Sequence, residues 1–191
     1  MLNIILFGPP GAGKGTQSEK IIEKYDLFHI STGDLFRKHM GEGTDLGKLA
    51  QEYIDEGNLV PDELVIKMVK VKIQSHENAK GFIFDGFPRT VAQAVALDEM
   101  LTSQGLNISG MLALEVEDEE LRSRIRLRGK TSGRADDQND ERINNRIKIY
   151  KQETLPVADH YAMKGKYHGI NGTGSIDEIF NHICMVIDLI K

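Results

Sequence analysis

Residues 2–16 read LNIILFGPPGAGKGT, an apolar run followed at once by a glycine-rich loop that carries a single lysine. The apolar run has the composition of a strand buried on both faces. Glycines let backbone N–H groups turn inward, and a following helix offers its unpaired amides and positive dipole end. The stretch therefore predicts a phosphate-binding loop between a strand and a helix. The alternative, a glycine-rich turn without a ligand, is disfavoured by the preceding strand and by the placed Lys14.

The loop departs from the common pattern at one position. The residue after Lys14 is Gly15 rather than Ser or Thr, and the first hydroxyl comes at Thr16. Direct ligation of magnesium by the residue after the lysine is therefore excluded. We expect Thr16 to contact a phosphate or a water of the metal shell.

Composition sets bounds on partners and location. The chain has 191 residues, of which 40% are hydrophobic, and a net charge of -5, which suits one α/β domain and disfavours nucleic acid or an anionic membrane as partner. Cys184 is the only cysteine, so we expect no internal disulfide and no structural zinc, and its apolar surroundings predict a core position. The first apolar run is too short for a signal peptide or membrane span, which predicts a cytoplasmic protein.

Short apolar runs alternate with longer amphipathic ones, the pattern of βαβ units around a parallel sheet. The expected strands are Asn3–Phe7, Phe28–Ser31, Gly81–Asp85, Met111–Val116 and Lys166–Ile170. The expected helices are Gly15–Tyr25, Gly33–Met40, Asp45–Glu56, Pro61–Ser75, Thr90–Gln104, Glu117–Arg128, Asn139–Met163 and Ser175–Ile190. The sequence thus predicts an α/β fold of the P-loop NTPase type, a parallel five-stranded sheet with helices on both faces.

Two segments break this alternation. Residues 32–74 hold three expected helices with no strand between them, and residues 129–139 form a polar stretch between two helices. Insertions of this kind on a parallel sheet usually build the ligand site. For the second segment, composition alone would favour an ordinary surface loop.

The third expected strand ends in Asp85 and continues into Gly86-Phe87-Pro88-Arg89. The carboxyl end of a parallel strand lies at the ligand edge of the sheet, where an acidic residue in P-loop proteins helps to hold Mg²⁺. An arginine just beyond a tight turn can grip a phosphate through two hydrogen bonds. Asp85 alone would more often be a cap or turn residue.

Arginines fall on loops and helix ends close to this predicted cleft. They are Arg37, Arg124, Arg128, Arg134 and Arg146, whereas Arg122 and Arg126 lie on a different helix face that we assign to solvent. Each arginine taken singly is most simply a surface residue. Together with the phosphate loop they favour phosphoryl transfer, which needs positive charge around the moving group.

The motifs GPPGAGKGTQ, STGDLFR, GNLVPDELV, DGFPRT followed by Gln93, and SGRADD resemble those of the adenylate kinase family, in family order along essentially the whole chain. The resemblance implies a single kinase domain over residues 1–191, with a helical monophosphate-binding segment at about 31–60 and a short lid at about 128–138. It implies reversible transfer of the γ-phosphoryl group of ATP to AMP, giving two ADP, with Mg²⁺ accompanying ATP. It also implies a monomer.

The same resemblance implies a role for each matching position. For ATP the implied positions are Gly11, Ala12, Gly13, Lys14, Gly15, Thr16, Arg124, Arg128 and the backbone of Gly174. For AMP they are Thr32, Arg37, Asn58, Leu59, Val60, Gly86, Phe87, Pro88, Arg89, Gln93, Arg134 and Arg146. Lys14, Arg89, Arg128, Arg134 and Arg146 would be catalytic, Asp85 would hold hydrated Mg²⁺, and Asp136 and Asp137 would help lid closure. Arg146 matches the family pattern better than Arg142, which stays open as the alternative bridging arginine.

Two alternatives remain. A UMP/CMP kinase resembles this chain in its phosphate loop, GFPR and short lid, but such enzymes usually carry Ala at the position of Thr32 and Asn at those of Thr90 and Gln93. The other alternative is a nucleotide-binding module that does not transfer phosphate. The retained arginines argue against that module.

Overall fold

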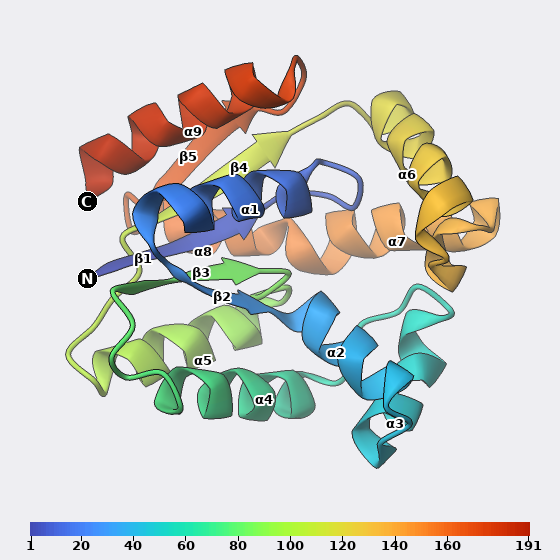
Figure 1. Ribbon diagram of the computed structural model, residues 1–191, viewed down its shortest axis with the longest axis horizontal. Helices are drawn as coiled ribbons and strands as arrows, with labels where there is room; N and C mark the ends of the chain where they lie inside the picture. The colour runs from blue at the N-terminus through green and yellow to red at the C-terminus, as the bar shows by residue number, and fades with distance from the viewer.

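The computed structural model describes residues 1–191, except for the side chain of Ala135. A parallel five-stranded sheet runs through the middle in the order β2-β3-β1-β4-β5 (Figure 1). The strands are β1 Leu2–Phe7, β2 Phe28–Ser31, β3 Gly81–Asp85, β4 Gly110–Glu115 and β5 Tyr167–Asn171. The predicted strands and fold class are confirmed, with bounds shifted by one residue in β1, β4 and β5.

Helices cover both faces of the sheet. They are α1 Lys14–Tyr25, α2 Thr32–Gly41, α3 Asp45–Ile54, α4 Asp62–Gln74, α5 Val91–Thr102, α6 Asp118–Ser132, α7 Asp140–Ile149, α8 Pro156–Ala162 and α9 Ile176–Ile190, with a short 3-10 turn η1 at Ala135–Asp137 and a π-helical turn η2 at Tyr150–Thr154. Helices α1 and α9 pack on one face, and α4, α5 and α8 pack on the other.

Alternation along β1 divides the core between these two layers. Ile4 and Leu6 belong to the cluster shared with α1 and α9, and Ile5 and Phe7 belong to the cluster shared with α4, α5 and α8. All four side chains are almost fully buried, which explains why β1 is apolar at every position but Asn3. Asn3 is satisfied internally, since its amide donates to Asn107 O at 2.9 Å and accepts from Phe82 N at 3.1 Å.

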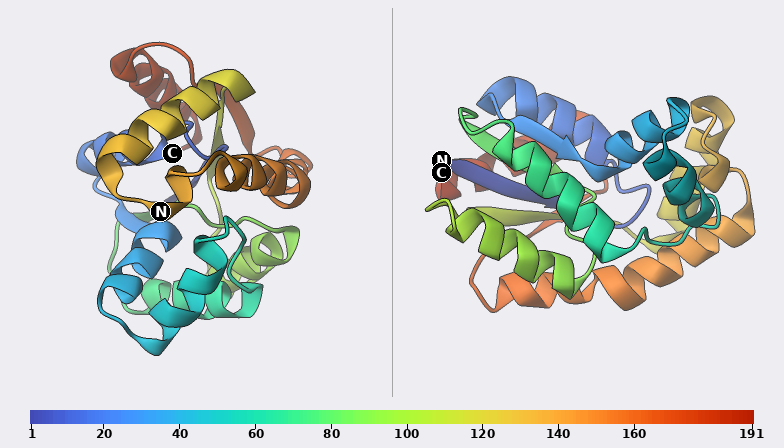
Figure 2. Two further views of the ribbon diagram at one scale, coloured as in Figure 1. Left: turned by 90° about the vertical axis from the view of Figure 1, so that its right-hand side faces the viewer. Right: turned by 90° about the horizontal axis from the view of Figure 1, so that it is seen from below.

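The two segments that interrupt the alternation lie at the same end of the sheet. Helices α2 and α3 form one projection, and α6 with η1 and the start of α7 forms the other, while both termini lie at the opposite end (Figures 1 and 2). Helix α6 runs to Ser132, four residues beyond its predicted end at Arg128, so the polar stretch 129–139 is partly helical. Gly133, at φ 66°, ends it.

The predicted single helix over Asn139–Met163 is interrupted at η2. Pro156 has no N–H for the carbonyl of Gln152, and its ring crowds that carbonyl, so the helix widens one turn earlier. Leu155 N instead donates to Tyr150 O, five residues back, at 2.7 Å. This π turn carries Tyr150 and Thr154 into the cavity described below.

Cys184 is buried, as predicted for a core position. Within the described part of the chain, no helix combines the length and the apolar character needed to cross a membrane.

Candidate active site

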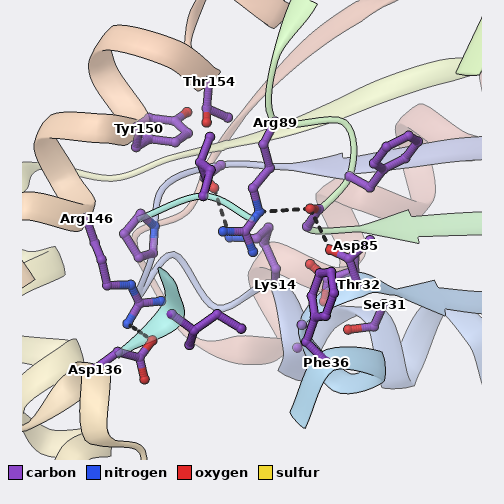
Figure 3. A pocket seen from close by; sticks show the side chains of 18 of the residues that line it. Lys14, Ser31, Thr32, Phe36, Asp85, Arg89, Asp136, Arg146, Tyr150 and Thr154 are labelled. Atoms are coloured by element: carbon purple, nitrogen blue, oxygen red, sulfur yellow. Dashed lines mark hydrogen bonds and ion pairs between the residues drawn. The ribbon is translucent and has the colours of Figure 1, made fainter. Parts of the chain in front are cut away.

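A cavity of about 450 Å³ opens at the carboxyl ends of β1, β2 and β3, in the size range of small-molecule sites (Figure 3). Its walls come from the phosphate loop, the β2–α2 junction, the α3–α4 connection, the β3–α5 loop, α6 with η1, and α7 with η2. The predicted site residues lining it are Gly11, Gly13, Lys14, Gly15, Thr16, Thr32, Arg37, Asn58, Leu59, Val60, Asp85, Gly86, Phe87, Pro88, Arg89, Gln93, Arg124, Arg128, Arg134 and Arg146. Ala12 and Gly174 are predicted positions that do not line it.

Glycine is required at several points of the phosphate loop. Gly11 has φ 85°, and a Cβ built there would lie 2.8 Å from Cγ1 of Ile125 on α6. Gly8 has φ 144°, and its Cβ would lie 2.8 Å from the carbonyl oxygen of Leu114. Gly13 precedes α1 at φ 93°, and no side chain caps the amides that follow. The loop therefore presents uncapped helix amides to the cavity, which suits an anion.

Lys14 bends back over its own loop, where its Nζ donates to Gly8 O at 2.8 Å and to Pro9 O at 3.0 Å. Desolvation in the cleft lowers the pKa of Lys14 to about 8; Asp85 opposes this shift, and Arg89 adds to it. A cation that is disfavoured by desolvation is stabilised by an anion bound beside it, because the anion favours the charged form.

Arg89 and Thr32 meet at one backbone carbonyl. Nε of Arg89 donates to Gly86 O at 2.8 Å, and Oγ1 of Thr32 donates to the same oxygen at 2.7 Å. Gly86 has φ 73°, and a Cβ there would come within 3.0 Å of both side chains. Desolvation, with Arg146 next in effect, lowers the pKa of Arg89 to about 10. A guanidinium held this way has its remaining N–H donors free for a ligand phosphate.

Gln93 is fully buried and is oriented from two sides. Its Oε1 accepts from Arg89 N at 2.8 Å, and its Nε2 donates to Asp62 Oδ1 at 2.7 Å. The other oxygen of Asp62 accepts from Thr90 Oγ1 at 2.8 Å. Each polar atom of the Gln93 amide keeps one further hydrogen-bonding position. The sequence alone gave no indication that Asp62 orients Gln93.

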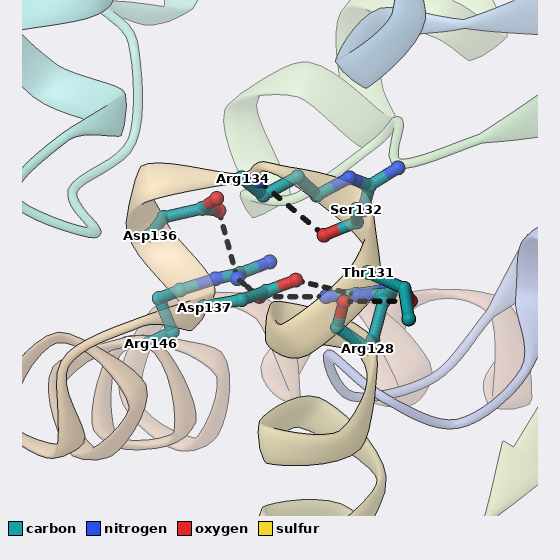
Figure 4. A network of polar contacts seen from close by, with 7 residues as sticks. All are labelled: Arg128, Thr131, Ser132, Arg134, Asp136, Asp137 and Arg146. Carbon is teal, nitrogen blue, oxygen red and sulfur yellow. Dashed lines mark hydrogen bonds and ion pairs between the residues drawn. The ribbon is translucent and has the colours of Figure 1, made fainter.

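A second charged network closes the lid side of the cavity (Figure 4). Asp137, whose side chain is completely buried, accepts from Arg128 Nε at 2.6 Å and Nη2 at 2.8 Å, and from Arg146 Nη1 at 2.6 Å. Asp136 also pairs with Arg146, at 2.7 Å. Burial raises the pKa of Asp137, but hydrogen bonds and charge from Arg128 and Arg146 outweigh it and lower the pKa below its usual value.

Arg37 and Arg134 are two further cations that line the cavity. Arg37 pairs with Asp34 one turn earlier on α2. The Arg134 guanidinium has no hydrogen-bond or ion-pair partner among the described residues, and burial, with Arg37 and Arg128 adding to it, lowers its pKa. An arginine that the described residues leave unpaired at a cavity wall favours an anionic ligand.

Arg124, on α6, is held in place by two hydrogen bonds. Its Nε donates to Glu120 at 2.7 Å and its Nη1 to Gly172 O at 3.1 Å. The structure therefore brings Arg124 to the 171–174 segment, although Gly174 itself, at φ 129°, lies outside the cavity wall.

Asp85 is the carboxylate beside the phosphate loop. Its side chain is mostly buried, lies 3.9 Å from His29 Nε2, and shares the cavity with Thr16. The described residues hold no cluster of three or more His, Cys, Asp or Glu side chains arranged for a metal ion. One carboxylate and a nearby hydroxyl fit a Mg²⁺ ion that keeps several waters and takes its other ligands from phosphates.

Sequence reasoning also missed two residues on the wall opposite α2. Tyr150 packs on Phe7 with ring centroids 5.8 Å apart, and the buried Thr154 lies beside it in Figure 3. The signal that could have found them is Pro156 inside an otherwise continuous helical pattern, since proline forces a local rearrangement of the turn before it.

Comparison with known proteins gives a consistent picture. The family model described as adenylate kinase matches residues 6–166. An adenylate kinase of Bacteroides thetaiotaomicron is 53% identical over 188 residues, 98% of this chain and 99% of that protein. An adenylate kinase of Parabacteroides distasonis is 52% identical over 191 residues, the whole of both chains. An adenylate kinase of Flavobacterium psychrophilum is 50% identical over 188 residues, 98% of this chain and 99% of that protein.

Proposed function

The chain belongs to the adenylate kinase family, and we propose that the cavity beneath its arginines is where it transfers the γ-phosphoryl group of ATP to AMP, in a reversible reaction that gives two ADP. The observation that carries this placement is the convergence of Lys14 and of arginines from separate segments on one cavity. The lowered pKa values of Lys14 and Arg89 support it, because a bound anion would stabilise cations that desolvation disfavours.

We assign the donor to the side of the phosphate loop. The residues proposed to contact ATP are Gly11 to Thr16, Arg124, Arg128 and the backbone of Gly174. The uncapped amides after Gly13 would cradle the β and γ phosphates, while Lys14 exchanges its loop carbonyls for phosphate oxygens. Arg124, next to the 171–174 segment, would lie against the base.

We assign the acceptor to the side of α2 and β3. Arg89 would grip the AMP phosphate, and Gln93, oriented by Asp62, would read the adenine edge. The remaining acceptor positions are Thr32, Arg37, Gly86, Phe87, Pro88 and, with their backbone against the AMP base, Asn58, Leu59 and Val60. Arg134 and Arg146 would bridge the acceptor and donor phosphates, a role for which Arg142 is the less favoured candidate.

The reaction requires little covalent chemistry from the protein. An oxygen of the AMP phosphate attacks the γ phosphorus in line, a new P–O bond forms, and the bond to the β-phosphate oxygen breaks to leave ADP. The attacking oxygen is already anionic, so no general base is required. Lys14, Arg89 and the bridging arginines stabilise the charge on the transferring group, and expulsion of water protects it from hydrolysis.

Adenylate kinases use Mg²⁺ with ATP in general, and Asp85 is the residue here that would hold the hydrated ion. When bound, the ion would neutralise part of the negative charge of the phosphates. The protein's own contribution at this point is to hold the Asp85 side chain in the cavity beside the phosphate loop.

We further propose one kinase domain over residues 1–191 in which the monophosphate-binding segment (about 31–60) and the lid (about 128–138) move relative to the sheet. We propose that the enzyme acts as a monomer on free nucleotides. A net charge of -5 supports the absence of nucleic-acid and membrane partners. We place the enzyme in the cytoplasm, where both nucleotides are available.

A coupled assay of ADP formation tests the acceptor assignment. With ATP as donor, AMP, CMP, UMP and GMP are supplied in turn, and we expect AMP to give the highest kcat/KM. A preference for CMP or UMP would favour the UMP/CMP kinase alternative, and nucleotide binding without turnover would favour the non-catalytic module.

A further inference from the structure

One side chain outside the cavity joins the α3–α4 connection to α7. Nδ2 of Asn145 donates to Glu56 O at 2.9 Å and to Asn58 Oδ1 at 3.1 Å. Both hydrogens of that amide are therefore used on a connection almost ninety residues earlier in the chain. Asn145 itself is not among the residues that line the cavity.

The connection lies against α7 at the same point. Gly57 has φ 78°, and a Cβ built there would lie 2.9 Å from Cγ of Arg146 and 3.1 Å from the carbonyl oxygen of Arg142. The connection is also hydrogen-bonded to the end of α3, since Asn58 N donates to Tyr53 O at 2.8 Å. The backbone at residues 57–58 is thus fixed between α3 and the helix that carries Arg146.

Two neighbouring residues of α7 therefore act on different parts of one site. Arg146 reaches Asp136 and Asp137 across the lid, and Asn145 reaches the backbone that forms the acceptor wall. We propose that Asn145 is a positioning residue for the acceptor, holding residues 55–60 on α7 and so fixing the base end of the acceptor site relative to Arg146. The inference rests on the proposed function, which places residues 58–60 against the AMP base.

The expected effect is confined to the acceptor. Asn145→Ala removes both hydrogen bonds, and we expect KM for AMP to rise about ten-fold, the equivalent of one to two net hydrogen bonds. KM for ATP and kcat at saturating AMP should change by less than about two-fold, because Lys14 and the arginines keep their positions. A general loss of structure would instead change both KM values and kcat together.

The chain offers a matched control one residue earlier. Asn144 lies on the same helix, but its Oδ1 accepts from Arg122 Nε at 3.1 Å, away from the connection. Asn144→Ala should leave KM for AMP unchanged. Asn58→Ala removes only one of the two bonds made by Asn145, so it should raise KM for AMP less than Asn145→Ala does. Added to Asn145→Ala, it should have a smaller effect than it has alone.

Amide hydrogen exchange on the nucleotide-free protein gives a readout that does not depend on activity. We expect exchange at residues 55–60 to speed up in Asn145→Ala and not in Asn144→Ala, with protection of β1 and β3 unchanged. Unchanged exchange at 55–60, or faster exchange throughout the core, would overturn the inference. Faster local exchange with an unchanged KM for AMP would overturn the placement of the acceptor base on this connection, and the positioning role with it.

Discussion

Asp137 holds Arg128 through two hydrogen bonds, at 2.6 and 2.8 Å, while its own side chain is completely buried. The same carboxylate accepts from Arg146, which lies on a different helix. A single lid carboxylate thus joins two of the arginines proposed to contact phosphates. It keeps them close together without neutralising Arg134, which remains for the ligand.

Replacing this carboxylate should cost stability in a pH-dependent way. At neutral pH we expect Asp137→Asn to lower the free energy of unfolding by about 2–4 kcal/mol, because two arginines lose a buried partner. The pKa of Asp137 is lowered in the folded protein, so its contribution is present above its unfolded pKa, about 3.9, and is lost as the pH falls through the lower folded value. Urea unfolding of both proteins at several pH values measures this. A difference that does not shrink toward low pH would contradict the assignment.

Arg89→Ala should abolish turnover while preserving the fold. We expect kcat to fall about 10³-fold or more, because an arginine that stabilises the transferring phosphoryl group has an effect of that size. The thermal midpoint by circular dichroism should change little, since the substitution removes a desolvated cation. Arg126→Ala is the matched control, because Arg126 is exposed and paired with Asp140 outside the cavity. Near-normal activity of Arg89→Ala with AMP would remove Arg89 from the acceptor site.

The lowered pKa of Lys14 predicts proton uptake when ATP binds. Near pH 8.5 the empty enzyme holds Lys14 largely neutral, since its pKa is about 8, and a bound triphosphate restores the cation by raising that pKa. Calorimetry in two buffers of different ionisation enthalpy should detect this uptake, and ATP affinity should fall as the pH rises above about 8. Lys14→Met should show no uptake. The same uptake in that variant would assign the proton to another group.

Two glycines of the phosphate loop should respond differently to alanine. Gly11→Ala introduces a methyl group 2.8 Å from Ile125 Cγ1 at φ 85°, and we expect it to lower the free energy of unfolding by about 1–3 kcal/mol. Gly15 lies in the first turn of α1 with nothing within 4 Å of the added carbon, so Gly15→Ala should be neutral or slightly stabilising. Chemical denaturation compares the two variants. Equal losses would contradict the positive φ and the close contact with Ile125 at Gly11.

The sheet and the phosphate loop could be predicted from the sequence because their signals are local. The strand before Gly8 is apolar on both faces, and the glycine spacing that leads to Lys14 has one dominant structural meaning. The arginines could be identified as candidates for a different reason. Their combination with that loop and the order of the motifs resembled a known family, although no single arginine is distinguishable from a surface residue.

Contacts between distant side chains could not be predicted. Nothing in the order of residues shows that Asp62 orients Gln93. Nor does it show that Arg128 is hydrogen-bonded to Asp137 instead of being exposed to solvent ions. These contacts depend on how α4 meets α5 and how η1 folds under α6, which tertiary packing decides. The π turn at Tyr150–Thr154 had a local signal in Pro156, but the helical period of its neighbours outweighed that signal in the prediction.

The most direct test of the account follows the labelled γ-phosphoryl group of ATP in a single turnover with AMP. We propose that the closed site excludes water and that the AMP phosphate is the nucleophile, so the label should appear in the β position of newly formed ADP, with little free phosphate. Omitting AMP should leave the label in ATP. Release of the label as inorganic phosphate at a similar rate with and without AMP would contradict the claim that this cavity aligns two nucleotides for direct transfer.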